Sequence, residues 1–519
     1  MSSSLSFLDN VIILLYFGLV LYIGLYYSRY KSNVKKNYFL AGKNLGWFAI
    51  GSSLFATNIS SEHLVGLAGA GSTYGLSVGH FEWLAAVILL LLGWIFAPIF
   101  LKADVYTVPQ FLGKRFDDSS RIYLTVVSIF SYLFTKIGVT LLAGSIVLKE
   151  VLGWDMFTSA ILMVLITGLY TVIGGLPSVI KTQIFQLFLL ILGSILLSMF
   201  GLIKVGGFHG LVDKLPSDFF TIFKSPSDPN LPWTGIMLGA PILGIWYWCT
   251  DQYIVQRILG ANDIKSAQKG TLFAALLKTL PIFFFIFPGL VAAVLYPGLK
   301  GDTAYSLLLA GDLLPMGIKG LVIAGLFAAL MSSLASAFNS ASSLVALDIY
   351  PYLRPNASEN EEVLVGRLST MLFVIIAIAI VPLIKMIDIH IYIHLQTIQA
   401  YIAPPIVSVF LFGIFWKKAT SQAAIWALVI GGFLGLVKII LSSMDLAVIM
   451  QYEILNFYYQ INYLHFAFYL FLVSSFIVFF LSLALKENAI TNSQNIKDRD
   501  TKGEIPATAN SGSFLRNIK

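Results

Sequence analysis

Long apolar runs, separated by short polar segments, dominate the chain from residue 8 to about residue 485. A bilayer core is about 30 Å thick, and an α-helix crosses it with roughly 20 apolar residues. The pattern therefore predicts about thirteen membrane-spanning helices. They are expected over residues 8–28, 46–74, 80–101, 122–148, 156–173, 182–203, 233–251, 271–297, 320–347, 366–387, 390–416, 421–443 and 462–485.

The composition agrees with a membrane protein. Hydrophobic types make up 58% of the 519 residues and charged types 11%, whereas soluble domains are about 45–50% apolar and about 25% charged. This balance excludes an ordinary soluble enzyme and a disordered protein. Cys249 is the only cysteine, so a disulfide-stapled secreted protein is excluded as well.

Lys and Arg residues concentrate in alternate loops, such as 29–43, 102–121 and 257–269, and in segment 486–519. Cytoplasmic loops carry an excess of these residues, which places the N-terminus outside and the C-terminus in the cytoplasm. The net charge of +7 is thereby explained without nucleic acid. We expect one transmembrane domain over 1–485 and a disordered cytoplasmic tail over 486–519. A multi-pass plasma-membrane protein is predicted, and the absence of disulfides and of a targeting segment fits a bacterial inner membrane.

Segment 51–75 breaks the apolar pattern with Ser, Thr, Asn, Glu, His and repeated Gly. Irregular backbone at membrane depth is tolerated only where it is buried in protein or lines a cavity. Glycine-interrupted helices are the sequence feature that best marks a transporter binding site. A helix broken at 56–59 would expose main-chain carbonyls.

Four ionisable residues lie inside predicted spans, and each must pair or face water because burial of a charge costs several kcal/mol. Glu82 could instead sit at the membrane interface. Lys136 could snorkel or form a structural pair. Asp251 is either a site residue or a structural partner of Arg257, and Lys278 lies well inside its span, which favours a functional role.

A serine-rich stretch runs from Ser332 to Ser340. Such serines can pack helices together, or they can offer hydroxyl oxygens to a hard cation such as Na⁺; spacing alone favours packing. The cluster 246–248, Trp-Tyr-Trp, can form an interfacial belt or stack on sugar rings. The chain has no phosphate-binding loop of an ATP-driven pump, no metal-ligand cluster and no nucleophile triad.

Six segments together resemble the solute:sodium symporter family, and within it the sodium/glucose (sodium/galactose) cotransporter branch. The resemblance covers residues 36–485. The segments are SLFATNISSEHLVGLAGAGSTYG (53–75), FEW (81–83), LFTKI (133–137), WYWCTDQYIVQR (246–257), MSSLASAFNSASS (331–343) and APPIVSVFLFGIFWKK (403–418).

The resemblance implies an all-α, LeuT-type fold, with two five-helix inverted repeats over 46–203 and 233–416. One helix (8–28) would precede them and two (421–485) would follow. A sodium site would take carbonyls and hydroxyls of Ala56, Ile59, Ala329, Ser332 and Ser333, an assignment that outweighs the packing interpretation of the serines. A sugar site would take Asn58, His63, Glu82, Lys278 and Gln396, and Tyr247 with Trp248 would form the inner gate.

Three positions depart from the family pattern. Gln183 stands where the family usually has an aspartate linked to sodium exit or to a second ion, and Ala335 replaces a hydroxyl found in relatives that carry two sodium ions. We therefore expect one Na⁺ per sugar. Gly244 stands where relatives have Asn or Thr beside the sugar, which leaves the substrate less defined.

The predicted function is Na⁺-coupled import of a hexose by alternating access, with no enzyme activity. A symporter for myo-inositol or another polyol is the first alternative, because it needs similar hydroxyl-binding groups. From another class, a membrane protein that senses a solute without net transport remains open, although segment 486–519 is too short for a kinase. The sequence leaves the exact sugar and the oligomeric state open.

Overall fold

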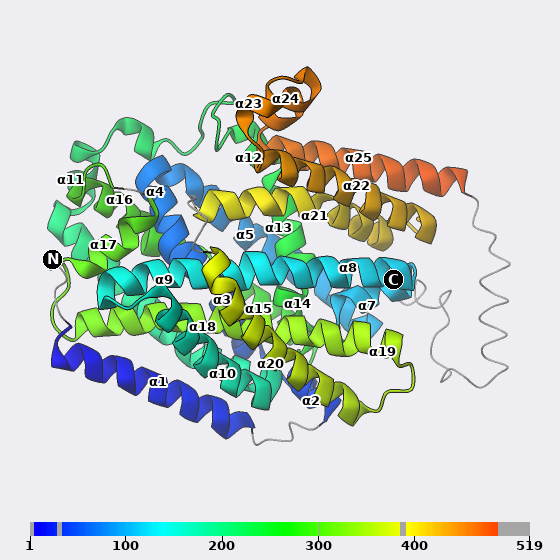
Figure 1. Cartoon of the computed structure of the whole chain (residues 1–519), viewed down its shortest axis with the longest axis horizontal. Coiled ribbons are helices and arrows are strands. Elements are labelled where there is room, and N and C mark those ends of the chain that lie inside the picture. Colours follow the sequence, from blue (N-terminus) through cyan, green and yellow to red (C-terminus); the bar gives the residue numbers. More distant parts are fainter. Residues whose placement is uncertain (1–4, 29–33, 300, 385–390, 486–519) are drawn as a thin grey trace.

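The computed structural model describes residues 5–28, 34–299, 301–384 and 391–485. Throughout these ranges the secondary structure is helical and contains no β-strand. The long helices run roughly side by side along one direction, and α1 begins at the opposite end of the bundle from the end of α25 (Figure 1). The tail expected over 486–519 lies outside the described residues.

The longer helices have the following bounds: α1 (Phe7–Ser28), α3 (Trp47–Asn58), α5 (His80–Leu91), α7 (Val108–Arg115), α8 (Asp118–Ser131), α9 (Val139–Leu152), α10 (Met156–Val205), α11 (Gly207–Lys214), α14 (Gln252–Leu259), α15 (Ile264–Leu277), α16 (Phe287–Leu295), α18 (Ile318–Leu344), α20 (Glu359–Ile384), α21 (Ile391–Phe415), α22 (Ser421–Ser442), α24 (Glu453–Gln460) and α25 (Tyr463–Ala484). Shorter helices and π-helical turns that extend or connect them include α2 (Lys35–Leu40), η2 (Glu62–Leu67), α4 (Ala68–Tyr74), η4 (Leu92–Phe96), α6 (Ala97–Ala103), η5 (Tyr132–Gly138), α12 (Trp233–Leu238), α13 (Ala240–Ile245), η7 (Trp246–Thr250), η8 (Ile282–Ile286), α17 (Ala304–Ala310), η10 (Val345–Ile349), α19 (Tyr350–Leu353) and α23 (Leu446–Ile449).

Within the described residues, each predicted span coincides with helix apart from short breaks, but the boundaries are less simple than the apolar pattern indicates. Among the described residues, 10 helical segments are long and apolar enough to cross a membrane. The spans expected over 156–173 and 182–203 form one long helix, α10, which is kinked at Gly175 (φ 59°, ψ −150°). Only glycine adopts this backbone conformation readily, and a Cβ there would lie 2.5 Å from the main-chain oxygen of Tyr38. The number of membrane crossings and the sidedness of the termini stay predictions.

One predicted boundary is wrong. The span expected to end at 251 continues after a break, because α14 resumes the helix to Leu259. Arg257, which the charge pattern assigns to a cytoplasmic loop, is therefore fully buried. Its guanidinium donates to the Ser336 hydroxyl and to the Tyr253 carbonyl, each at 2.6 Å, and these contacts satisfy a charged group that a loop assignment places in water.

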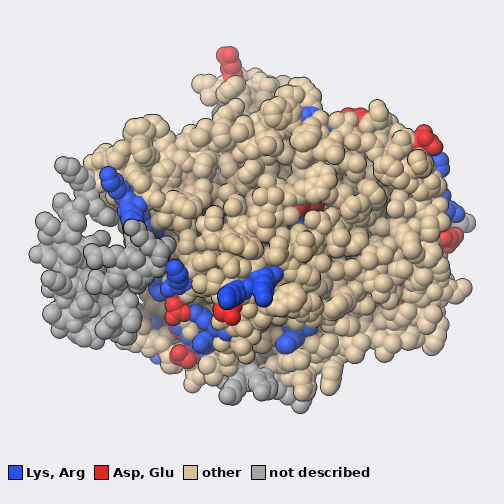
Figure 2. Space-filling model, turned by 180° about the vertical axis from the view of Figure 1, so that it is seen from behind, with Lys and Arg blue, Asp and Glu red and all other residues tan. Residues whose placement is uncertain are grey.

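Much of the face shown in Figure 2 carries no charged side chain. Lys and Arg gather mainly beside the grey residues and in the lower middle of this view, and most of the remaining surface is tan. Large apolar side chains are exposed on several helices in this way, including Leu14, Phe130, Ile203, Ile375 and Phe476. An apolar exterior of this extent suits contact with lipid.

The α18 helix lies at the centre of the bundle. Its membrane-length window is 94% buried, and it packs against α1, α3, α10 and α20. Its first turn is held by the Asp9 carboxylate of α1, which accepts from Gly317 N at 2.8 Å and from Gly320 N at 2.7 Å. A carboxylate at this end both satisfies free N–H groups and complements the helix dipole.

Candidate functional site

The first predicted interruption is a helix break in the middle of the bundle. Helix α3 ends at Asn58, and Ile59 has an extended conformation (φ −72°, ψ 109°). The Ser60 hydroxyl then accepts from Glu62 N at 3.0 Å, so that Ser60 starts the next helical segment, η2. The break leaves the last carbonyl groups of α3 without partners inside the helix.

Side chains from two other helices reach these carbonyl groups. Ser332 of α18 donates its hydroxyl to Ala56 O at 2.7 Å and to Ala329 O at 2.9 Å. The Thr57 carbonyl accepts from Ser333 at 3.3 Å and from the Tyr253 hydroxyl at 2.8 Å. The structure thus brings Ala56, Ala329, Ser332 and Ser333 together at the negative end of the α3 dipole.

Carbonyl and hydroxyl oxygens are the ligands that hard cations prefer. Of the residues predicted for a sodium site, Ile59 forms the break itself. Ser332 and Ser333 also pack α18 against α3. The helix-packing and cation-binding interpretations of these serines therefore concern the same contact. The residues present fit an alkali cation that would replace the hydroxyl hydrogens as the partner of the carbonyls.

A second break, which the sequence did not predict, lies at Asp251 between η7 and α14. The Asp251 carboxylate accepts from Tyr253 N at 3.0 Å and so caps α14, and it also accepts from the Tyr132 hydroxyl. No ion pair within 4.0 Å joins it to Arg257 among the described residues, and it does not line the cavity. Asp251 therefore has a structural role as the cap of α14.

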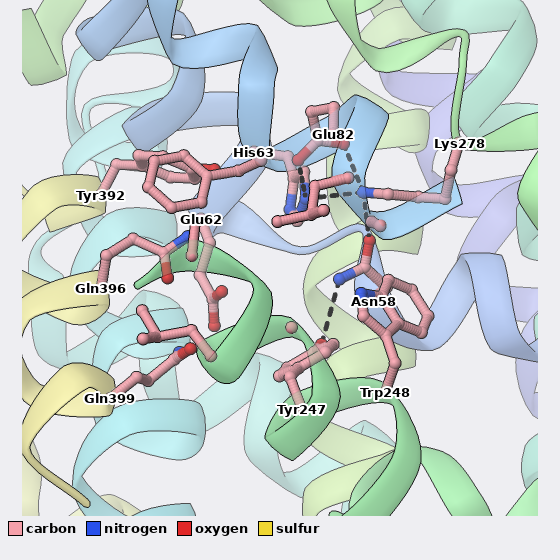
Figure 3. A pocket seen from close by; sticks show the side chains of 16 residues that line it. Asn58, Glu62, His63, Glu82, Tyr247, Trp248, Lys278, Tyr392, Gln396 and Gln399 are labelled. Atoms are coloured by element: carbon pink, nitrogen blue, oxygen red, sulfur yellow. Dashed lines mark hydrogen bonds and ion pairs between the residues drawn. The ribbon is translucent and has the colours of Figure 1, made fainter. Parts of the chain in front are cut away.

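A cavity lies beside the two breaks (Figure 3). It is lined by residues from α3, η2, α5, α13, η7 and α21 and by Lys278. The lining residues are Asn58, Glu62, His63, Phe81, Glu82, Leu84, Ala85, Ala240, Leu243, Gly244, Tyr247, Trp248, Lys278, Tyr392, Gln396 and Gln399.

The polar side chains at one end of the cavity form a connected network. The Lys278 ammonium contacts the Glu82 carboxylate and donates to Asn58 Oδ1 at 2.7 Å. The Asn58 amide donates to the Tyr247 hydroxyl at 3.1 Å, and His63 Nε2 lies 3.3 Å from Glu82 Oε1. Glu82 is only 3% exposed, so the interfacial alternative for this residue is wrong.

A helix interruption places Lys278 at this position. Helix α15 ends at Leu277, and helical structure resumes at Ile282, just after Pro281. Proline lacks the N–H group that would continue the helix. The pair of Lys278 with Glu82 keeps a buried ammonium compensated by an opposite charge and by hydrogen bonds.

The predicted gate residues also face the cavity. Tyr247 and Trp248 lie on the π-helical turn η7 and are buried, and the centroid of the Trp248 ring is 5.7 Å from Lys278 Nζ. These positions exclude an interfacial belt for this pair. Gln396 lines the cavity from α21, so the structure brings all predicted sugar-site residues to one cavity.

Sequence reasoning missed several lining residues, of which Glu62, Tyr392 and Gln399 carry polar groups. Glu62 lies in the polar segment that we singled out, but its partner Lys136 is distant in sequence. The Lys136 ammonium is 3.6 Å from Glu62 Oε1 and 4.4 Å from the centre of the Tyr247 ring. Lys136 is 2% exposed, which excludes snorkelling and bears out the paired alternative.

The positions that depart from the family pattern have distinct surroundings. The Gln183 amide nitrogen donates to Ser336 at 2.7 Å and to Thr57 Oγ1 at 3.0 Å, roles that a carboxylate could not fill. Ala335 is buried without a hydroxyl. Gly244 lines the cavity, and a Cβ there would lie 2.2 Å from Ile88 Cδ1, so a larger residue would require Ile88 to move.

Comparisons with known proteins agree with this architecture. The family model described as Sodium:solute symporter family matches residues 38–431. Sodium/myo-inositol cotransporter 2 of Oryctolagus cuniculus is 39% identical over 471 residues (83% of this chain and 70% of that protein). Sodium/glucose cotransporter 1 of Sus scrofa is 36% identical over 524 residues (92% and 79%). A Na⁺-coupled sialic acid symporter solved in a substrate-bound outward-open state superposes with a TM-score of 0.80 at 23% identity, over 92% of this chain and 98% of that one.

Proposed function

The chain belongs to the sodium:solute symporter family, and from this premise we propose that it imports a hexose of the glucose or galactose type together with Na⁺. It is a multi-pass integral membrane protein with the LeuT-type fold, not an enzyme, and Na⁺ is the co-transported ion. The observation that carries the proposal is the contact of Ser332 with the Ala56 carbonyl at the α3 break.

We assign Na⁺ to the oxygens of Ala56, Ile59, Ala329, Ser332 and Ser333. The support is their convergence at the break, together with the dipole of α3, whose negative end points to the same place. An ion bound there would hold α3 to α18. It would thereby favour one arrangement of the broken helix over the other, which is how a ligand shifts a conformational equilibrium.

We assign the sugar to the cavity lined by Asn58, His63, Glu82, Lys278 and Gln396. Sugar hydroxyls both donate and accept hydrogen bonds, so an amide, a carboxylate and an ammonium can hold them in fixed geometry. Trp248 and Tyr247 offer aromatic surface beside these groups. A sugar without one of the bound hydroxyls would leave a buried polar group unpaired, which is the physical basis of specificity.

We propose that the inverted repeats cover 46–203 and 233–416. Both ranges begin with a helix that breaks in its middle, at Ile59 and at Asp251, and discontinuous helices at corresponding positions are typical of such repeats. The two breaks meet through the Tyr253 hydroxyl and the Thr57 carbonyl. Rocking of the bundle around this point would open the cavity alternately to each side.

We further propose one Na⁺ per sugar, because Gln183 and Ala335 remove oxygens that a second ion would use. For location we propose the plasma membrane, and specifically the inner membrane of a bacterium, on the ground that Cys249 is a free, buried thiol and no disulfide is needed. Immunodetection in separated membrane fractions of the source cells tests the location.

Uptake into proteoliposomes tests the function. We expect radiolabelled glucose or galactose to accumulate only with an inward Na⁺ gradient, and accumulation to stop when the gradient is collapsed with a sodium ionophore. Uptake that is independent of Na⁺, or binding without any uptake, would contradict symport. The latter result would favour a solute sensor.

A symporter for myo-inositol or another polyol is the second candidate. The specific observation in its favour is the 39% identity with Sodium/myo-inositol cotransporter 2. Competition of unlabelled glucose, galactose and myo-inositol against one another in the same proteoliposomes separates the two candidates, since the preferred substrate will inhibit at the lowest concentration.

A further inference from the structure

The cavity has a second charged pair that the assignments above do not use. Glu62 lines the cavity from η2, and its carboxylate faces Lys136 at 3.6 Å. This separation is too long for a hydrogen bond. Within the described part of the chain, the Lys136 ammonium has no hydrogen-bond partner, and no side chain donates to the Glu62 carboxylate.

Burial makes a hydrogen-bond donor valuable to the Glu62 carboxylate, whereas the Lys136 ammonium also lies over the rings of Tyr247 and Tyr253. Glu62 is 7% exposed and Lys136 is 2% exposed, and a buried carboxylate without donors loses the hydrogen bonds that water would give it. Only Glu62 of the pair lines the cavity. A solute in the cavity can therefore reach the carboxylate of Glu62, whereas the Lys136 ammonium lies outside the cavity lining.

Figure 3 shows that Glu62 lies apart from the Lys278 network. Glu82, His63 and Lys278 cluster at one end of the cavity, and Glu62 lies at the other, with Gln396 and Gln399 beside it. The cavity therefore presents a carboxylate at each end. Each carboxylate is matched by one ammonium, so these groups together carry no net charge and favour an uncharged solute.

We propose that Glu62 is a substrate-binding residue that accepts hydrogen bonds from hydroxyls at the end of the solute opposite to the Lys278 network. This inference rests on the proposed function and narrows its substrate class. The cavity would take a neutral ring with free hydroxyls at both ends, such as an unsubstituted hexose or a cyclitol. It would reject uronates, amino sugars and rings that lack a hydroxyl at the Glu62 end.

Solute binding to the purified protein in detergent tests the role of Glu62 separately from transport. Binding is measured in the presence of Na⁺ as a solute-dependent shift in melting temperature. The probes are glucose, galactose and myo-inositol, the single-deoxy analogues of the preferred one, glucuronate and glucosamine. For the wild type we expect glucuronate and glucosamine to bind at least about tenfold more weakly than the preferred solute, and one deoxy analogue to do the same.

Glu62→Ala should weaken binding of the preferred solute about tenfold or more. It should also abolish the difference in affinity between this solute and that one deoxy analogue. The Na⁺ concentration for half-maximal effect should not change. Glu62→Gln, which keeps shape and one acceptor oxygen, should lie between the wild type and Glu62→Ala. Glu150→Gln, at an exposed carboxylate of α9, is the matched control and should behave as the wild type.

An equal loss for all analogues in Glu62→Ala, or a charged solute that binds the wild type as tightly as the neutral one, would overturn the inference. The proposed function fails by a different result, which is absence of Na⁺-driven uptake by the wild-type protein. Since binding is measured separately, that failure would leave the test of Glu62 intact. If Glu62→Ala does not fold, the affinities of Glu62→Gln and of the wild type for the deoxy analogues are compared instead, and this comparison decides whether Glu62 binds the solute.

Discussion

The hydroxyl of Ser332 lies 2.7 Å from the main-chain oxygen of Ala56, and this contact joins the end of α3 to α18 in the middle of the bundle. Two features meet there. One is a helix end whose carbonyl groups have no partner inside α3 because Ile59 leaves the helical conformation. The other is the hydroxyl-rich face of α18. Both partners must be present for the site to hold a cation, which makes each open to test.

Substitution of Ser333 by alanine removes one of the proposed Na⁺ ligands without adding bulk. We expect Na⁺-dependent uptake to be lost at Na⁺ concentrations that saturate the wild type, because a hard cation loses an oxygen that nothing replaces. The measurement is initial uptake rate against external Na⁺. Ser342→Ala is the matched control, since the Ser342 hydroxyl donates to Asn339 O within α18. Normal uptake with unchanged Na⁺ dependence in Ser333→Ala would refute the cation assignment.

Gln396→Ala should affect the sugar and not the ion. Gln396 lines the cavity from α21 and is not among the proposed Na⁺ ligands, so we expect the apparent sugar affinity to fall about tenfold, as for loss of one or two hydrogen bonds. Expression and the Na⁺ dependence should match the wild type. Uptake rate against sugar concentration at fixed Na⁺ measures the effect, and an unchanged half-saturation value would remove Gln396 from the site.

The stoichiometry sets how far sugar can be concentrated. One charge crossing 100 mV releases about 2.3 kcal/mol, and a tenfold Na⁺ gradient adds about 1.4 kcal/mol. At one Na⁺ per sugar, these terms support an accumulation of several hundred-fold, whereas two Na⁺ would support more than about 10⁵-fold. Steady-state accumulation in tight proteoliposomes with both gradients imposed distinguishes the cases. Simultaneous ²²Na⁺ and sugar fluxes provide a second measure, and a flux ratio near two would contradict the role given to Gln183 and Ala335.

Arg257→Ala should destabilise the protein. The guanidinium is fully buried and links α14 to α18 through Ser336, so alanine would leave a void and remove charge-assisted hydrogen bonds, together a loss of a few kcal/mol. We expect a lower melting temperature in detergent. Arg354→Ala is the control, because the Arg354 side chain is 61% exposed and its ion pair with Glu361 is at the surface. Equal melting temperatures for both variants would mean that Arg257 has no structural role.

The apolar pattern predicted where helices lie, and the polar segment 51–75 predicted the first break correctly, because both signals are local in sequence. The second break was missed for a physical reason. The sequence pattern places Asp251 at the end of a span and Arg257 in a polar loop, and only the fold reveals that Tyr132 is beside Asp251 and Ser336 beside Arg257.

The residues of the site were likewise predicted only in part. The residues of the Lys278 network were named through resemblance to a family, and the structure places them around one cavity. Glu62 was not named, although it lies one residue from His63, because its significance depends on Lys136. That pairing joins segments far apart in the chain, which a single sequence does not show.

The pairing of Glu82 with Lys278 and of Glu62 with Lys136 has a consequence for the electrical behaviour of the transport cycle. If the charges of the fixed groups cancel in this way, the return of the empty carrier would move no net charge across the membrane. Membrane voltage would then act on the sodium-loaded step alone, and recorded currents would vanish whenever the ion is withheld, whatever the sugar concentration.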